Sequence, residues 1–226
     1  MGLRKFGWVI VCALALQIGL VTPASAYEWP ELLQVGDKGR AVVALQVRVA
    51  GWYPDKNQTL FEIDGVFSEH TETALQAFQT HYGLVPDGIA GLATFEALNA
   101  LEDPDHTTIH FDFSEFWQNR NSDCSKEANR YAGTFEGGKI PEKEVKKNVR
   151  RLMWRLEALR AKLGDKPIAI NSGFRSVEYN RCIRGASMSQ HMYGTAVDMR
   201  VVEVSNRKAR NYGRGSQVHG IGCYSS

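Results

Sequence analysis

The stretch Ser189-Gln190-His191-Met192-Tyr193-Gly194-Thr195-Ala196-Val197-Asp198 decides how the second half of the chain is interpreted. It places an imidazole and a carboxylate seven residues apart and is followed by the β-prone run Met199–Val202. A neutral imidazole and a carboxylate are two of the three protein ligands that a catalytic zinc requires. Gly194 and Ala196 leave room for the backbone to turn and to bring His191 and Asp198 together. The spacing alone is more typical of a solvated loop, so the neighbouring sequence has to decide.

Residues 1–26 have the features of an export signal. Arg4 and Lys5 precede an apolar run from Phe6 to Val21, and Ala24-Ser25-Ala26 forms a small-residue cleavage site. We therefore expect an exported, extracytoplasmic protein, with a mature chain that begins at Tyr27 and is not inserted in the membrane. An uncleaved N-terminal anchor is the alternative.

The remaining chain divides into two segments of opposite charge. Residues 27–105 carry 4 basic and 13 acidic side chains, whereas residues 106–226 carry 21 basic and 12 acidic ones. This asymmetry indicates two units with different surfaces. No interleaving of aromatic and basic residues indicates nucleic-acid binding. We expect a monomer with no nucleic-acid partner.

The mature chain contains three cysteines, Cys124, Cys182 and Cys223. In an exported protein this number predicts one disulfide and one remaining thiol. The sequence alone leaves the pairing open.

Residues 33–101 contain a short internal repeat. Ile63–Ser68 precedes Thr71 and Pro86–Gly91 precedes Thr94, and each segment has an Asp-Gly turn before a helix start. Apolar spacing predicts helices over residues 41–49, after Ser68 as N-cap, and after Gly91.

These motifs resemble the three-helix peptidoglycan-binding domain. The likeness covers residues 33–101 and rests on Gly36-Asp37-Lys38-Gly39, on Ile63-Asp64-Gly65-Val66-Phe67, and on Gly83-Leu84 with Asp87-Gly88-Ile89. It implies peptidoglycan as the partner. Residue for residue, these positions build the bundle and do not outline a binding site.

The second unit begins after a polar stretch, residues 102–110, that contains Pro104 and that we expect to be a linker. An aromatic cluster follows and is expected to pack the second core: Phe111, Phe113, Phe116 and Trp117. An apolar stripe then predicts a core helix that starts with Pro141 and ends at Gly164: Val145, Val149, Leu152, Leu156, Leu159 and Leu163. Pro167–Ile170 is expected to be a short buried strand.

That strand leads into the turn Asn171–Ser176, which contains Arg175. An arginine there can bind a carboxylate through two hydrogen bonds, which suits a substrate that ends in a free C-terminus. A surface arginine in a loop is the alternative, and the turn alone favours it.

The motifs of the second unit together resemble the zinc D-alanyl-D-alanine carboxypeptidases, a group that includes the vancomycin-resistance dipeptidases. They are Gly173–Ser176, Gly185-Ala186-Ser187 and Ser189-x-His191-x-x-Gly194-x-Ala196-x-Asp198, in that order. The likeness runs from about Phe111 to the C-terminus, residues 111–226. It implies an α+β domain with one Zn²⁺ that hydrolyses the terminal D-Ala-D-Ala bond of peptidoglycan stem peptides.

Carried over by position, His191 and Asp198 match the first two zinc ligands of that family. Arg175 matches the arginine that binds the substrate or polarises its carbonyl, and Ser189 is expected to contact the substrate. Cys124 and Cys182 lie where some members have a disulfide, which is the pairing that the resemblance implies.

The resemblance implies a third zinc ligand and an acidic general base near the C-terminus. Gly220–Ser226 is similar only to the sequence that leads into that segment, and His219 stands where the family places no ligand. We therefore expect a C-terminally truncated peptidase domain. A non-catalytic peptidoglycan-binding protein and a related cell-wall endopeptidase are the alternatives.

Overall fold

A computed structural model describes residues 27–54, 61–121, 123–214 and 222–223. The expected signal peptide, residues 1–26, and His219 lie outside these ranges. Within them, no helix combines the length and the apolar composition that crossing a bilayer requires.

The first unit is helical and contains the three helices that the sequence predicts. Its elements are α1 (Arg40–Val49), the 3₁₀ helix η1 (Ala50–Trp52), α2 (Glu69–His81) and α3 (Leu92–Asn99). Their apolar faces bury Leu45, Leu75, Phe78 and Leu98 almost completely. Ser68 occupies the N-cap of α2 as expected, but its side chain makes no capping hydrogen bond.

A buried glutamine organises each of the two Asp-Gly turns. The Gln46 side-chain amide donates to Asp64 Oδ1 (2.9 Å) and Thr71 Oγ1 (3.3 Å), while its oxygen accepts from the Gly65 N–H (2.8 Å). Gln79 makes the equivalent bonds at 2.9, 3.2 and 3.0 Å with Asp87, Thr94 and Gly88. The internal repeat is therefore a repeat of hydrogen bonding as well as of sequence.

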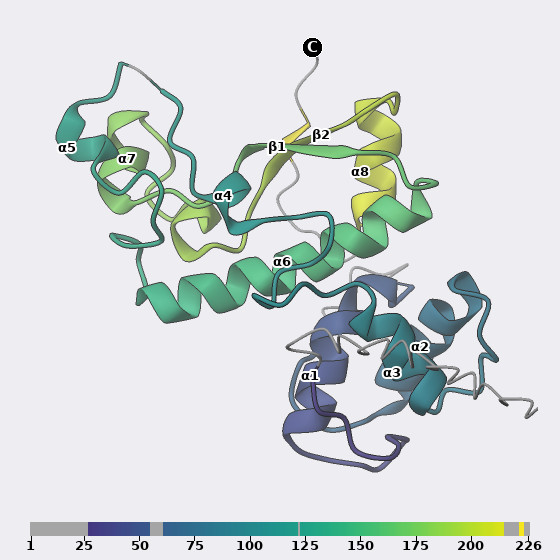
Figure 1. Cartoon of the computed structure of the whole chain (residues 1–226). Coiled ribbons are helices and arrows are strands. Elements are labelled where there is room, and N and C mark those ends of the chain that lie inside the picture. The colour runs from purple at the N-terminus through teal and green to yellow at the C-terminus, as the bar shows by residue number, and fades with distance from the viewer. Residues whose placement is uncertain (1–26, 55–60, 122, 215–221, 224–226) are drawn as a thin grey trace, which may run out of the picture.

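The second unit combines helices with a small sheet, so the chain has the expected α+β class. Its elements are α4 (Phe113–Phe116), α5 (Lys126–Asn129), α6 (Glu142–Lys162), β1 (Ile168–Ser172), α7 (Val177–Cys182), the 3₁₀ helix η2 (Gln190–Tyr193), β2 (Asp198–Val201), α8 (Asn206–Arg214) and β3 (Gly222–Cys223). The described strands have the order β1-β2-β3, with β1 antiparallel and β3 parallel to β2. Figure 1 shows α7 and α8 near opposite ends of this sheet.

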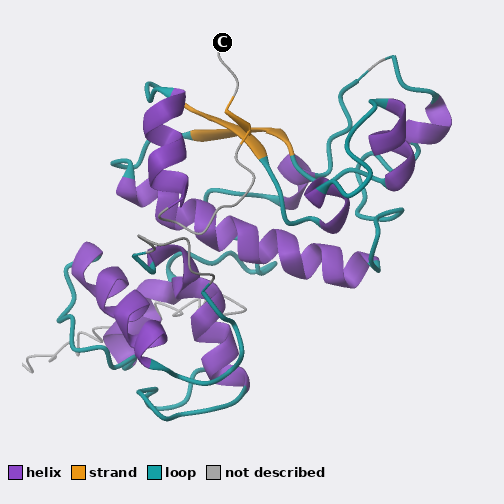
Figure 2. Ribbon diagram, turned by 180° about the vertical axis from the view of Figure 1, so that it is seen from behind, coloured by secondary structure: helices purple, strands orange, loops and turns teal. Residues whose placement is uncertain are grey.

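Helix α6 lies between the sheet and the first unit in both Figure 1 and Figure 2. The predicted apolar stripe is buried in the second core together with Phe111 and Phe116. Three other residues of α6 belong to the core of the first unit: Trp154, Ala158 and Ala161. Pro141 is the N-cap of α6 and not its first helical residue, because its ψ of 146° is extended.

Residues 102–110 are packed between the two units. Glu102 accepts a hydrogen bond from Arg48 Nε (3.2 Å), and Glu157 of α6 accepts from the His110 backbone N–H (3.2 Å). Thr107 and Thr108 are buried. The sequence predicts a linker here from polarity and Pro104. Neither feature reveals that the Glu102 carboxylate binds Arg48 of α1.

Candidate functional site

His191 and Asp198 come together because the chain reverses between η2 and β2. Gly194 ends η2 in the left-handed region (φ 69°), and a Cβ there would lie 3.0 Å from Val145 Cγ1 of α6. Glycine is thus required for both conformation and space. The reversal places His191 in η2 opposite Asp198, the first residue of β2.

The two side chains face each other with the spacing of co-ligands. His191 Nε2 lies 3.5 Å from Asp198 Oδ2, and both residues are buried. This is longer than a good N–H···O hydrogen bond. Two ligand atoms on one tetrahedral zinc are about 3.4 Å apart, given metal–ligand distances of about 2.0–2.1 Å. The donor pair therefore fits zinc in both chemistry and separation.

The orientation of the His191 ring is fixed from behind. Its Nδ1 lies 2.6 Å from the Gly173 carbonyl oxygen, which accepts only, so Nδ1 carries the proton. In the neutral ring the lone pair is then on Nε2, the atom that faces Asp198. Ligating histidines in proteins are commonly held in this way. The sequence motif includes Gly173 but does not reveal that its carbonyl holds the imidazole. A Cβ at Gly173 would lie 2.5 Å from the Phe116 oxygen, which explains why no side chain stands there.

Arg175 is directed at Asp198. Its Nη2 donates to Asp198 Oδ2 (2.5 Å), its Nε donates to Ser172 Oγ (2.9 Å), and its backbone N–H donates to the His191 carbonyl (3.1 Å). The guanidinium thus holds the same carboxylate oxygen that faces the imidazole. Arg175 therefore lies beside His191 and Asp198, as the sequence predicts. The carboxylate that it binds in this structure is that of Asp198.

Ser189 is the N-cap of η2, two residues before His191. Its side chain caps no backbone N–H, and the residue is half-buried. Its contact with a substrate remains a prediction.

The described residues contain no group of three histidine, cysteine or acidic side chains close enough to share a metal. Within those ranges the donor set is His191 and Asp198. These ranges do not supply the third ligand that the resemblance implies.

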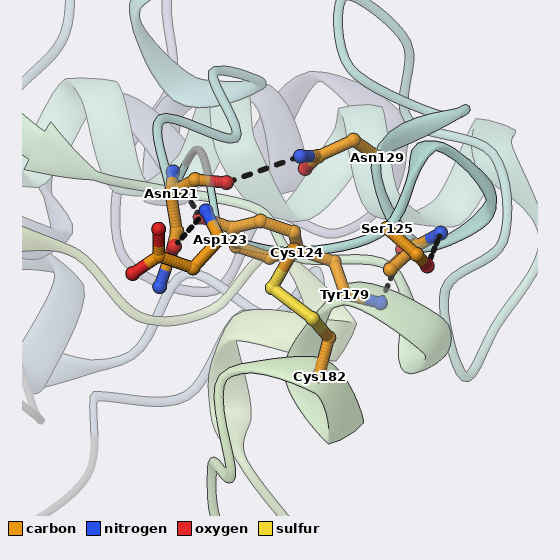
Figure 3. Close-up of a disulfide and its surroundings, with 9 residues drawn as sticks. Asn121, Asp123, Cys124, Ser125, Asn129, Tyr179 and Cys182 are labelled. Carbon is orange, nitrogen blue, oxygen red and sulfur yellow. Dashed lines mark hydrogen bonds between the residues drawn. A yellow bond between two sulfur atoms is a disulfide. The ribbon is translucent and has the colours of Figure 1, made fainter.

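A disulfide joins Cys124, just before α5, to Cys182 at the end of α7, with Cα atoms 5.7 Å apart (Figure 3). The Asn121 backbone N–H donates to the Tyr179 hydroxyl (2.9 Å) in the same region. Helix α7 follows Arg175 directly, so the disulfide ties the segment after the site to the loop before α5.

The first unit carries an open groove of about 460 Å³. Val85 (75% exposed), Leu92 (72% exposed) and Ile89 line it and remain accessible to solvent. Exposed aliphatic side chains around a hollow are typical of a contact surface.

Comparisons with known proteins match both units. Residues 38–98 match the model of a peptidoglycan binding domain, and residues 122–226 match that of peptidase M15. The chain is 43% identical over 173 residues to the zinc D-Ala-D-Ala carboxypeptidase of Streptomyces albus G, which covers 76% of this chain and 62% of that protein.

Two solved structures match part of the chain. The SleB N-terminal domain is 35% identical with a TM-score of 0.27, over 31% of this chain and 93% of that one. A peptidoglycan-binding protein from Clostridioides difficile is 33% identical with a TM-score of 0.28, over 34% and 45%. In the order of the two units, the chain thus matches a peptidoglycan binding domain over residues 38–98 and peptidase M15 over residues 122–226.

Proposed function

We propose that this chain is a zinc metallopeptidase of the D-Ala-D-Ala carboxypeptidase type, which acts outside the cytoplasm on peptidoglycan stem peptides. The observation that carries the proposal is the 3.5 Å separation of His191 Nε2 and Asp198 Oδ2, with Nδ1 bound to the Gly173 carbonyl. The 43% identity to a zinc D-Ala-D-Ala carboxypeptidase supports the substrate class. The chain spans 62% of that relative's length.

His191 and Asp198 would hold the zinc. When bound, the metal lowers the pKa of a water molecule and polarises the carbonyl of the scissile bond. Hydrolysis adds one water across the amide, releases D-Ala with a free amine and leaves a carboxylate on the shortened peptide. Arg175 keeps the Asp198 carboxylate oriented through its 2.5 Å hydrogen bond. Because this contact is partly buried, the carboxylate stays aligned with the imidazole.

We propose that the first unit attaches the protein to the cell wall. The match of residues 38–98 to a peptidoglycan binding domain supports this, and the groove bordered by Val85 and Leu92 is the candidate contact. The export signal that the sequence predicts supports the same compartment as the wall.

A non-catalytic peptidoglycan-binding protein is the second candidate function. Its support is the match of residues 38–98 to a peptidoglycan binding domain, because binding to the wall does not require catalysis. A cell-wall endopeptidase is a further alternative within the same chemistry.

Product analysis separates these functions. The zinc-loaded chain is incubated with a stem pentapeptide that ends in D-Ala-D-Ala, and the products are identified by mass spectrometry. The proposal predicts free D-Ala and the tetrapeptide, with neither product after treatment with a chelator or from a pentapeptide that ends in L-Ala. Cleavage of cross-linked muropeptides without D-Ala release would identify an endopeptidase, and no cleavage of either would leave the binding function.

A further inference from the structure

A pocket of about 280 Å³ opens beside α7, separate from the His191–Asp198 pair. Val177, Asn180 and Arg181 of α7 line it, together with Lys139 and Arg184. Met192, the residue after His191, also lines it. Val177 lies two residues after Arg175, so the pocket shares two short segments with the candidate site.

The charged side chains that line this pocket are all positive. Lys139, Arg181 and Arg184 line it, and no acidic side chain does. Some other exposed cations of the same unit are paired, such as Lys146 with Glu142 and Lys166 with Glu203. In the described part of the chain, the three pocket cations have no carboxylate within ion-pair distance. Three unpaired cations around one hollow favour an anionic ligand.

Arg184 stands where the backbone favours glycine. It follows the C-cap of α7 with a φ of 56°, and the next N–H, of Gly185, donates to the Asn180 carbonyl (2.8 Å). Such helix ends usually have glycine at the left-handed position, because a side chain there adds strain. Gly185, by contrast, has no room for a side chain, since a Cβ would lie 2.2 Å from Asn180 Oδ1. The strained position therefore contributes a cation to the pocket.

Asn180 supplies a second kind of polar group. It is 3% exposed, and its Nδ2 donates to the Ala186 carbonyl (2.9 Å). Its Oδ1 is buried and has no hydrogen-bond partner. A buried acceptor without a partner is costly, so a ligand N–H would satisfy it. Cations together with a carbonyl acceptor suit a peptide segment that carries a carboxylate.

The pocket wall is also firmly held. The disulfide at Cys182 fixes the end of α7, and the Lys139 backbone N–H donates to the Met192 carbonyl (3.0 Å). The Ser176 hydroxyl accepts from the Tyr179 N–H (3.0 Å) and caps the start of the helix. A rigid wall loses little entropy when it binds a ligand.

We propose that this pocket binds a carboxylate of the peptide substrate at a residue upstream of the scissile bond, with Asn180 Oδ1 accepting an N–H of the same peptide. The inference rests on the proposed peptidase function and adds a specificity subsite to it. Lys139, Arg181 and Arg184 favour a peptide with a negative charge at this residue. The site at His191 and Asp198 acts on the C-terminal peptide bond.

Equilibrium binding tests the subsite without turnover. Two stem pentapeptides are compared on the metal-free chain by calorimetry: one has a γ-linked glutamate with a free α-carboxylate, the other its carboxamide. The wild type should bind the carboxylate about tenfold more tightly, as expected for charge-assisted hydrogen bonds. Lys139→Ala/Arg181→Ala/Arg184→Ala should bind both peptides equally.

The matched control is Arg207→Ala/Lys208→Ala/Arg210→Ala on α8, which removes the same residue types at the other end of the sheet (Figure 1). This control should keep the preference. Arg181→Gln changes one exposed side chain and serves as the test if the triple variant fails to fold. It should lower the preference for the carboxylate peptide about threefold. A pocket variant that keeps the full preference, or a wild type without one, would overturn the subsite.

Hydrolysis of the carboxamide peptide by the zinc-loaded chain reports on the proposed function separately. Absence of D-Ala release from both peptides, with the binding preference intact, would reject the peptidase activity and leave the pocket in place. Release of D-Ala from both peptides, without a binding preference, would support the peptidase activity and reject the subsite.

Discussion

The Nζ of Lys162 in α6 lies 2.6 Å from the carbonyl oxygen of Gly51 in η1, so a hydrogen bond joins the second unit to the first. The ammonium also lies 5.5 Å from the centre of the Trp52 ring. Gly51 itself rests on α6 so closely that a Cβ would be 2.6 Å from Ala158 Cβ. The first unit is therefore packed against α6, the longest helix in the described part of the second unit.

This contact predicts that Gly51→Ala destabilises the whole chain. The added methyl group would overlap Ala158, and overpacking of this kind costs about 1–3 kcal/mol. Ala158→Gly removes the opposing methyl group, so the double variant should be more stable than the sum of the single effects predicts. Urea unfolding of the four proteins measures the coupling. Additive effects would show that the two residues are not in contact.

A pH dependence follows from the burial of Lys162, which lowers its pKa from 10.5 to about 8. Between pH 8 and 10.5 the unfolded chain binds the proton more strongly, so the free energy of unfolding should rise with pH through this window. The gain is about 3 kcal/mol at most. Lys162→Met should remove this rise relative to the wild type in guanidinium titrations at pH 7.5, 9 and 10.5. The same slope in both proteins would contradict the prediction.

The groove of the first unit predicts where the wall is bound. Leu92→Asp and Val85→Asp should each reduce co-sedimentation of the full chain with purified peptidoglycan about tenfold, because each replaces exposed apolar contact area with charge. Leu32→Asp is the matched control, since Leu32 is also exposed (43%) and does not line the groove. Equal losses for all three variants would point to a general effect of charge.

The Cys124–Cys182 disulfide closes a loop of 58 residues. Cys124→Ser/Cys182→Ser should lower the free energy of unfolding by about 3–4 kcal/mol. Hydrogen exchange should increase first in α5 and α7, which the bond connects. Added reductant should have no further effect on the variant. An unchanged melting temperature would show that the bond contributes nothing to stability.

Sequence periodicity predicts the elements of this fold better than their contacts. The stripe from Val145 to Leu163 identifies α6, because apolar residues at helical spacing face one core. It does not identify the second face, where Trp154 and Ala158 pack on the first unit. Alanine on a helix is uninformative by itself, and its partner Gly51 is more than 100 residues away in the chain.

The site shows the same limit. The motif around His191 and Asp198 predicts that the two side chains meet, since the glycine between them permits the reversal, and they lie 3.5 Å apart. The motif does not show that Arg175 binds Asp198, or that the Gly173 carbonyl fixes the imidazole. The first contact depends on how the segment after β1 lies against β2, and the second on how it lies against η2. No local pattern specifies either arrangement. The basic pocket beside α7 is equally hidden, because its cations come from separate segments.

Zinc content tests the central claim most directly. The purified chain, saturated with Zn²⁺ and dialysed, should retain one zinc per molecule, and His191→Ala and Asp198→Asn should each weaken binding at least about 100-fold. His70→Ala, a change at an exposed histidine of the first unit, should retain the metal. Stoichiometric zinc in His191→Ala, or none in the wild type, would contradict a metal centre built on His191 and Asp198.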